Sequence, residues 1–416
     1  MSSFVHFIAA AAPGVTPPSP GAVSLFDTIS VTAYPFATYG PICVSRDGYT
    51  VFAIGNDNGQ LGVWVWRWNG TAWPNLQILH LSTSGDATGM TPYLDSMLRC
   101  NEDGSKVFLA LRSADSGKGV VYVFHESAAN TWAELQRIAN PTGTADRFGY
   151  SIACDDSGDR FVVGAAGYDT GTFDPIYGNP VYGRLYFYHL SGTYTTETTL
   201  DATHGMWSGA PPGLGDFVAM SGDGTVVISG DNDFTDSFIG IGNLESFTRS
   251  GSTWSQVARV APTDDVPGNV FSLVGKGVRL TSNGSDVYAV SDQYDRVVRY
   301  SISAGAMTYS NVYVGPLDTD TAKAYSVYKH MGMSDDGTIF QIGMPEFDGT
   351  HTDQGRVSRW VSRAYVSSET YSPAGVGHNA GRCVDLSADG SIAVWTVAQV
   401  SGGASGPGDR VYAKVY

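Results

Sequence analysis

Residues 217–229 read FVAMSGDGTVVIS, which is an apolar run, a short polar turn and a second apolar run. Asp-Gly or Asn-Gly between two apolar runs predicts a β-hairpin, because both residues tolerate the positive φ of a type I′ turn. The pattern occurs seven times, and successive turn glycines are 53 to 66 residues apart. Seven hairpins at a near-constant period predict a repeat architecture. The turns are Asp47-Gly48, Asp103-Gly104, Ser157-Gly158, Asp223-Gly224, Asn283-Gly284, Asp336-Gly337 and Asp389-Gly390.

Each repeat shows the same succession of strand patterns. One apolar strand precedes the turn and a second follows it. After a variable polar loop comes a third strand, such as residues 184–190, and then a Gly- or Ser-rich turn and a fourth strand, such as residues 254–260. Stacking such sheets around an axis buries both faces of each sheet. The sequence therefore predicts an all-β fold, a seven-bladed β-propeller with four antiparallel strands in each blade.

The two ends of the chain predict how the ring closes. Residues 410–416 form the third strand of the seventh repeat, and no fourth strand follows them. Residues 24–32 resemble a strand that precedes the first repeat and has no partner there. We expect this segment to complete the last blade, which hides two strand edges. The propeller then spans residues 24–416, and residues 1–23 form an apolar arm with a Pro-rich spacer.

Composition excludes two classes of function. The chain has 416 residues and a formal net charge of −16, and only 15% of its residues are charged. An acidic surface repels phosphate backbones, so we expect no nucleic-acid partner. No stretch is long and apolar enough to predict a membrane span.

The four cysteines each lie in the strand just before a hairpin turn. They are Cys43, Cys100, Cys154 and Cys383. The sequence contains no Cys-x-x-Cys pair, which argues against zinc. We interpret the cysteines as small buried core residues. Disulfides between adjacent repeats are the alternative, because Cys100 and Cys154 stand at the same offset from their turns.

The third repeat resembles a known family. It contains Phe148-Gly149 before its turn and Gly164-Ala165-Ala166 after its second strand. These residues resemble the FG-GAP repeat of integrin α-subunit propellers and of bacterial and phage proteins, and Gly343-Met344-Pro345 is the next match. The resemblance covers residues 24–416 at the scale of blades and implies a propeller.

The same resemblance implies candidate calcium loops, because integrin-type repeats bind calcium after the second strand. Asp231, Asp233 and Asp236 form the best matching loop, and their carboxylates are suitable calcium ligands. The alternative is ordinary turn chemistry, and we expect no other cofactor. No nucleophile elbow, zinc-protease or phosphate-loop motif occurs, so we predict that the protein is not an enzyme.

Long loops on a rigid scaffold are the usual place for binding surfaces. The longest inserts here are residues 166–182 and 200–215, and both are aromatic. We predict that they form a recognition face for a host-surface glycan or protein. The residues expected to bind are Tyr168, Phe173, Tyr177, Tyr182 and Trp207.

The N-terminal arm suggests how the protein is mounted. Phe4, Val5, Phe7 and Ile8 make it apolar, and we predict that they anchor the chain to other subunits of a larger assembly. This layout predicts a non-enzymatic phage virion component, a tail or capsid appendage that displays its propeller. One alternative is a secreted or cell-surface adhesin that binds glycans or proteins, with or without calcium. A propeller glycosidase or lyase is the other alternative.

Overall fold

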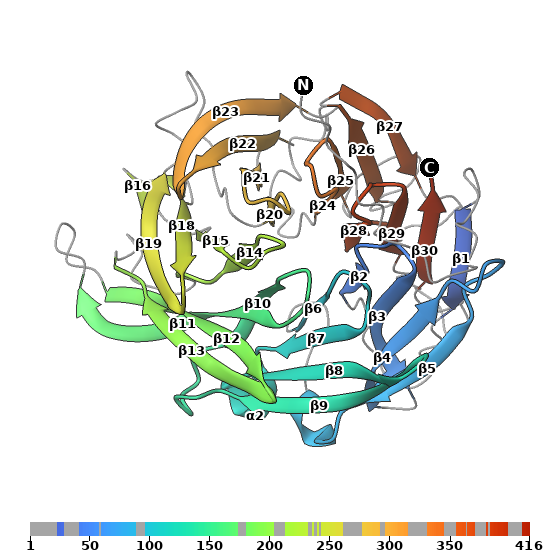
Figure 1. The fold of residues 1–416 in the computed structure, drawn as a ribbon, viewed down its shortest axis with the longest axis horizontal. Helices are drawn as coiled ribbons and strands as arrows, with labels where there is room; N and C mark the ends of the chain where they lie inside the picture. Colours follow the sequence, from blue (N-terminus) through green and yellow to red (C-terminus); the bar gives the residue numbers. More distant parts are fainter. Residues whose placement is uncertain are drawn as a thin grey trace.

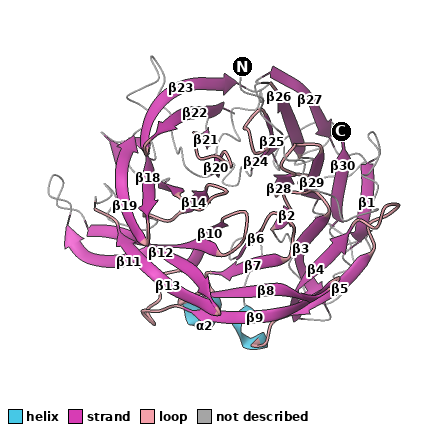
Figure 2. Cartoon of the chain, viewed as in Figure 1, coloured by secondary structure: helices cyan, strands magenta, loops and turns pink. Residues whose placement is uncertain are grey.

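The strands of the chain are arranged in a ring around a central axis in the computed structural model (Figure 1). Nearly all of the regular structure is β-strand (Figure 2). The structure describes residues 23–28, 41–57, 60–88, 96–173, 180–203, 213–231, 235–236, 239–240, 243–260, 277–291, 296–314, 331–344, 355–362, 364–370, 380–381, 383–397 and 410–416.

The described strands form seven antiparallel sheets of four strands, so the predicted seven-bladed propeller is confirmed. From the axis outward, the first four blades are β2 (Ile42–Val44), β3 (Thr50–Asp57), β4 (Gln60–Arg67), β5 (Asn75–His80); β6 (Ser96–Cys100), β7 (Lys106–Leu111), β8 (Val120–Ala128), β9 (Thr131–Ala139); β10 (Phe148–Cys154), β11 (Arg160–Phe173), β12 (Pro180–Ser191), β13 (Thr193–Asp201); and β14 (Phe217–Met220), β15 (Val226–Asp231), β18 (Asn243–Ser250), β19 (Thr253–Val260).

The remaining blades repeat this order. They are β20 (Gly277–Leu280), β21 (Asp286–Ser291), β22 (Arg296–Ser303), β23 (Ala306–Val314); β24 (Met331–Met333), β25 (Ile339–Met344), β26 (Arg356–Val361), β27 (Ala364–Thr370); and β28 (Val384–Leu386), β29 (Ile392–Val397), β30 (Arg410–Val415), β1 (Val23–Thr28). The small additional elements are η1 (Ser84–Ala87), α2 (Ala114–Gly117) and the pair β16 (Thr235–Asp236) and β17 (Ile239–Gly240). Within the described residues, no helix is both long and apolar enough to cross a membrane.

The predicted closure of the ring is confirmed. Strand β1 is the outer strand of the seventh blade and pairs antiparallel with β30, from Val23 opposite Lys414 to Thr28 opposite Arg410. The strand begins at Val23, one residue earlier than expected, so Val23 belongs to the blade. Residues 1–22, which make up the rest of the predicted arm, lie outside the described residues.

The seven hairpins are present, but their predicted turn type is wrong. Type I′ turns need positive φ at both central residues. Here only the glycines have positive φ, between 64° and 79°, while the residue before each glycine does not. In the first turn, the Gly48 N–H donates to the Ser45 carbonyl at 2.8 Å. The Asp47 carboxylate accepts the Tyr49 N–H at 2.9 Å. The acidic side chain thus stabilises the turn as an acceptor, as short polar residues often do.

A closed ring of seven backbone hydrogen bonds joins these turns around the axis. Each bond connects neighbouring blades, and its N···O distance is 2.7 to 3.0 Å. The donors and acceptors are Ala388 to Arg46, Asp47 to Glu102, Glu102 to Asp156, Asp156 to Gly222, Gly222 to Ser282, Ser282 to Asp335 and Asp335 to Ala388. The ring fixes the spacing of the seven innermost hairpins, so side chains near these turns are held around one point.

The hydrophobic core is divided into seven clusters, one at each interface between neighbouring blades. Between blades 1 and 2, the ring centroids of Phe52 and Trp132 are 5.9 Å apart in an edge-to-face contact. The Trp132 indole N–H also donates to the Gly104 carbonyl at 3.0 Å. Burying a large apolar side chain contributes about 1.5–3 kcal/mol. Apolar packing at all seven interfaces between blades therefore stabilises the ring.

Candidate functional site

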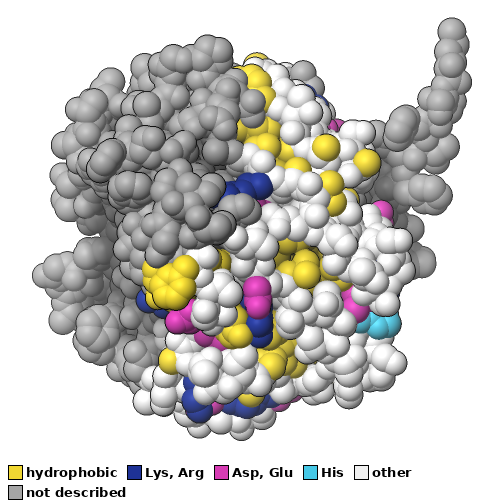
Figure 3. All heavy atoms as spheres, turned by 90° about the vertical axis from the view of Figure 1, so that its left-hand side faces the viewer, with side chains coloured by type: hydrophobic (Ala, Val, Ile, Leu, Met, Phe, Trp, Pro, Cys, Tyr) yellow, Lys and Arg dark blue, Asp and Glu magenta, His cyan; other side chains and the backbone are white. Residues whose placement is uncertain are grey.

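Three of the five aromatic residues predicted to form a recognition face are described. Tyr168, Phe173 and Tyr182 lie where β11 and β12 extend beyond the other strands of their blade. Phe173 is 67% exposed, whereas the Tyr168 ring is covered by Arg184, whose guanidinium carbon is 3.7 Å from the ring centroid. Figure 3 shows hydrophobic side chains in separate groups among polar ones on this side of the molecule. Tyr177 and Trp207 lie outside the described residues, so the recognition face stays a prediction.

The predicted calcium loop and anchoring residues cannot be compared with the structure. The side chains of Asp231, Asp233 and Asp236 lie outside its described part, as do Phe4, Val5, Phe7 and Ile8. Among the residues that are described, no group of three or more His, Cys, Asp or Glu side chains is placed to hold a metal ion.

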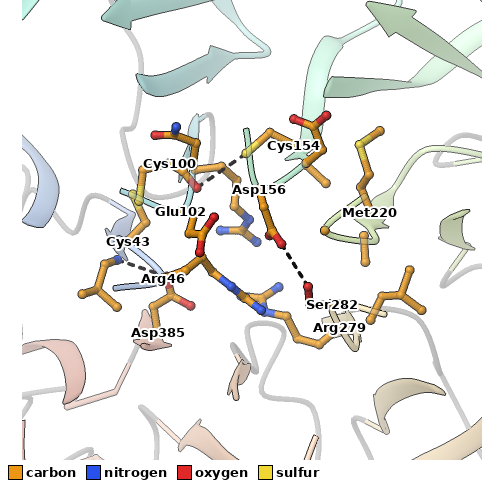
Figure 4. A pocket seen from close by; sticks show the side chains of 18 of the residues that line it. Cys43, Arg46, Cys100, Glu102, Cys154, Asp156, Met220, Arg279, Ser282 and Asp385 are labelled. Atoms are coloured by element: carbon orange, nitrogen blue, oxygen red, sulfur yellow. Dashed lines mark hydrogen bonds between the residues drawn. The ribbon is translucent and has the colours of Figure 1, made fainter. Parts of the chain in front are cut away.

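A polar cavity of about 90 Å³ lies on the axis, between the innermost strands and their turns (Figure 4). Charged side chains from five blades line it, which is unusual for the interior of a protein. These residues are Arg46, Arg99, Glu102, Asp155, Asp156, Arg279 and Asp385. Sequence reasoning did not single out this cavity as a site.

The register of the repeats explains why these side chains meet. Arg99, Arg279 and Asp385 each stand five residues before the turn glycine of their blade. Arg46, Glu102, Asp156 and Ser282 each stand two residues before it, on the ring of backbone hydrogen bonds. Residues at equivalent positions in different blades lie at the same level along the axis of a propeller. Charges at these positions therefore face one shared space.

Arg99 and Arg279 are the two cations of the cavity that have no carboxylate partner in the described part of the chain. Each guanidinium donates to a carbonyl of its own strand, Arg99 to Leu98 at 2.9 Å and Arg279 to Val278 at 3.2 Å. Burial and the charges of Arg99 and Arg46, opposed by Asp385, together lower the pKa of Arg279 to about 9. An anion placed between the two groups would relieve this repulsion.

Two side-chain links near the axis join blades that are not neighbours in the ring. Arg46 of blade 1 forms an ion pair with Asp335 of blade 6. The Ser282 hydroxyl of blade 5 donates to the Asp156 carboxylate of blade 3 at 3.0 Å. Gly222, in the blade between them, leaves the room for this contact, because a Cβ there would lie 2.0 Å from Asp156 Oδ2 and 2.2 Å from Ser282 Oγ. The links hold Arg46 and Asp156 in fixed positions.

Glu102 is an exposed carboxyl group at the edge of the cavity. Partial burial raises its pKa, the negative charges of Asp156, Asp103 and Asp47 raise it further, and Arg46 opposes them. A carboxylate whose pKa is raised is a better proton acceptor than an ordinary one. Burial also raises the pKa of Asp155, but that residue is only 4% exposed. Glu102 is therefore the exposed candidate for general-base chemistry here.

The sequence carried one usable signal for this site. Innermost strands of a propeller are buried on both faces, and charged residues in such strands are rare. Arg99, Arg279 and Asp385 stand inside short apolar strands, and aligning the repeats on their turn glycines puts all three at one position. That alignment predicts a charged ring on the axis.

Comparisons with known proteins support the propeller fold but assign the chain to no family. No family model matches the chain, so the FG-GAP assignment has no support beyond its motif, and no curated protein matches either. Several solved structures are similar at 14% identity. One is described as a candidate 6-phosphogluconolactonase from Bacteroides uniformis (TM-score 0.53; 84% of this chain and 91% of that one). The others are the hydrazine synthase of Kuenenia stuttgartiensis (0.51; 88% and 95%) and a protein from Lactobacillus plantarum (0.51; 82% and 86%).

These comparisons correct two predictions. The predicted phage virion component is wrong, because none of the three similar structures is described as part of a phage. The prediction that the protein is not an enzyme is wrong as well, since two of the three carry the names of enzymes. The first prediction relied on the apolar N-terminal arm and the second on the absence of catalytic motifs. A missing motif is weak evidence here, because a propeller can host many functions and can build a site from residues of separate blades. The predicted partners and location are tested by none of these findings.

Proposed function

We propose that this propeller is a hydrolase whose axial cavity binds the acidic group of a small sugar-acid lactone or ester. The observation that carries the proposal is the pair Arg99 and Arg279, two cations of the cavity without a carboxylate partner in the described chain. Guanidinium groups bind carboxylates and phosphates with strong, directional hydrogen bonds. An enclosed site that holds unpaired cations is suited to an anionic ligand.

The volume of the cavity limits what enters it. Pockets for whole drug-sized ligands measure roughly 300–1,000 Å³, whereas this cavity measures about 90 Å³. It has room for a carboxylate or phosphate group and not for a whole sugar. The rest of the substrate would extend toward the exposed carboxyl of Glu102.

Glu102 would act as the general base in this reaction. It would take a proton from a water molecule as the water oxygen attacks the lactone carbonyl. When the bond from the carbonyl carbon to the ring oxygen breaks, the protonated Glu102 would return this proton to the leaving ring oxygen, which becomes a hydroxyl group. Asp156 would act through Glu102, because its negative charge raises the Glu102 pKa. The hydrogen bond from Ser282 holds Asp156 in place for this role.

The description of the Bacteroides uniformis protein supports the reaction class. It is described as a candidate 6-phosphogluconolactonase, and the two chains share a fold over 84% of this one. The FG-GAP resemblance at Phe148-Gly149 concerns the ancestry of the blades and is compatible with this function. Membership of the FG-GAP family remains a proposal that rests on this motif.

Lactone hydrolysis followed by pH-stat titration tests the proposal. The purified chain should hydrolyse 6-phosphogluconolactone, whose phosphate is the acidic group, faster than the spontaneous reaction. Glu102→Gln should lower kcat by about 100-fold, the usual contribution of a general base. Arg279→Met should mainly raise KM, since it removes one of the two cations that bind the acidic group.

The control variants remove a negative or a positive charge at positions far from the axis. Glu134, on the outer strand β9, is replaced by Gln, and Lys118, the residue after α2, is replaced by Met. Both should leave kcat and KM within about two-fold of the wild type. A wild-type rate equal to the spontaneous rate for 6-phosphogluconolactone, or equal losses in the control variants, would rule out the proposed hydrolase.

A further inference from the structure

Two cysteines face each other across the interface between blades 1 and 2. Cys43 lies on β2 and Cys100 on β6, and the two residues are 1% and 9% exposed. Both belong to the same hydrophobic cluster and both line the axial cavity. A backbone hydrogen bond of 3.0 Å from Asp47 to Glu102 joins the two hairpins directly beyond them. The strands that carry the cysteines are thus held side by side.

The two thiol groups lie beside each other. Figure 4 shows the two sulfur atoms together on the cavity wall, and each thiol is close enough to shift the pKa of the other. Neither cysteine is in a disulfide. The third cysteine of the cavity makes a different contact, because the Cys154 thiol donates to the Cys100 backbone carbonyl at 3.5 Å. Contact between side chains therefore favours the pair Cys43 and Cys100 over Cys100 and Cys154.

We propose that Cys43 and Cys100 form a disulfide between the two blades when a hydroperoxide enters the axial cavity, with Cys43 as the attacking thiol and Cys100 as the resolving thiol. This redox site is independent of the proposed hydrolysis. It joins the first two blades covalently beside Arg99, the residue that precedes Cys100.

The surroundings of the two thiols distinguish their roles. Burial raises the pKa of both groups. For Cys43, the neighbouring Cys100 and the charge of Arg99 oppose this rise in pKa, whereas Asp385 adds to it. The pKa of Cys100 is raised further than that of Cys43, and Cys43 and Asp385 add to the effect of burial there. Cys43 is therefore the thiol that ionises more readily, and the thiolate is the form that attacks a peroxide.

The reaction balances in two steps. The Cys43 thiolate attacks one oxygen of hydrogen peroxide, which forms Cys43 sulfenic acid and releases hydroxide. Hydroxide takes up the proton that Cys43 had lost and becomes water. The Cys100 sulfur then attacks the sulfenic sulfur, the S–S bond forms, and the hydroxyl group leaves with the Cys100 proton as a second water. Two thiols are oxidised and one peroxide is reduced to two waters.

Peptide mapping tests the pairing directly, because trypsin places the four cysteines in four peptides, 1–46, 100–106, 148–160 and 383–410. The folded wild-type protein is treated with hydrogen peroxide, denatured, blocked with N-ethylmaleimide and digested. We expect peptides 1–46 and 100–106 to be joined, with two of the four thiols lost. Four alkylated cysteines, or a link from 100–106 to 148–160, would overturn the proposal.

Single variants test the two roles. In Cys100→Ser the sulfenic acid has no resolving thiol, so dimedone should label Cys43. In Cys43→Ser, dimedone should not label Cys100, and labelling there would contradict the assigned roles. Cys383→Ser is the matched control, since this buried cysteine lies between blades 7 and 1. It should leave the cross-link unchanged, and the wild-type mapping remains decisive if a variant fails to fold.

Discussion

Glu245 is a buried carboxyl group whose protonation is linked to the stability of blade 4. It lies on β18 and is 4% exposed. The Gln256 amide donates to it at 2.7 Å, and the nearest guanidinium nitrogen, Nε of Arg259, is 3.9 Å away. Burial raises the pKa of Glu245 to about 7, and Arg259 only partly opposes this. The folded protein therefore binds a proton here that the unfolded chain releases near its ordinary pKa of 4.5.

This difference predicts how stability changes with pH at Glu245. Between pH 4.5 and 7 the folded state holds more protons than the unfolded state, so the free energy of unfolding falls as the pH rises. Glu245→Gln should remove this loss and stabilise the protein by roughly 3 kcal/mol at pH 8, and by little at pH 4. Urea unfolding at both pH values measures the effect. An equal change at the two pH values would show that Glu245 does not titrate as described.

The cavity residues show what sequence reasoning could and could not find. Repeat alignment gives the common position of Arg99, Arg279 and Asp385. The alignment does not show which way these side chains point, because an innermost strand is buried on both faces and either face can turn toward the cavity. Arg46 and Glu102 were harder still to recognise, since they occupy turn positions where charged residues are ordinary. Their roles depend on contacts with blades 6 and 3, which lie far away in sequence.

Single elements were predicted closely wherever turn chemistry bounded them. The fourth strand expected at residues 254–260 is β19, which begins one residue earlier, at Thr253, and ends at Val260. The third strand expected at residues 184–190 is β12, which instead runs from Pro180 to Ser191. It begins earlier because β11 pairs with it beyond the blade, at Asp169 opposite Tyr182 and Phe173 opposite Pro180. Pairing between strands, and not local propensity, decides where such a strand ends.

The N-terminal strand β1 gives a prediction at the scale of one element. It covers the outer edge of β30 and is the link that closes the ring. Deleting residues 1–28 should expose that edge, lower Tm by on the order of 5 °C and promote association between molecules. Deleting residues 1–22 is the matched control, and it should leave Tm unchanged because β1 remains. Equal Tm values for the two deletions in differential scanning calorimetry would mean that β1 does not stabilise the ring.

At the scale of the whole molecule, the repeated hairpin pattern predicts the fold. The site forms because equivalent positions of the blades surround one axis. Seven equivalent hairpins predicted the blades, and the ring of backbone hydrogen bonds explains why their spacing is regular. The function did not follow, because a propeller scaffold hosts many unrelated activities. The feature on which the proposed function rests is the axial cavity, which is lined by three arginines and several carboxylates.

A crystal structure of the protein with bound 6-phosphogluconate, the product acid of the proposed reaction, tests the central claim most directly. We expect the phosphate group of the product to lie in the axial cavity, with hydrogen bonds from both Arg99 and Arg279 in place of their bonds to the Leu98 and Val278 carbonyls. The remainder of the product should extend toward Glu102. A product bound elsewhere, with both arginines still on those carbonyls, would contradict the assignment of the cavity as the active site.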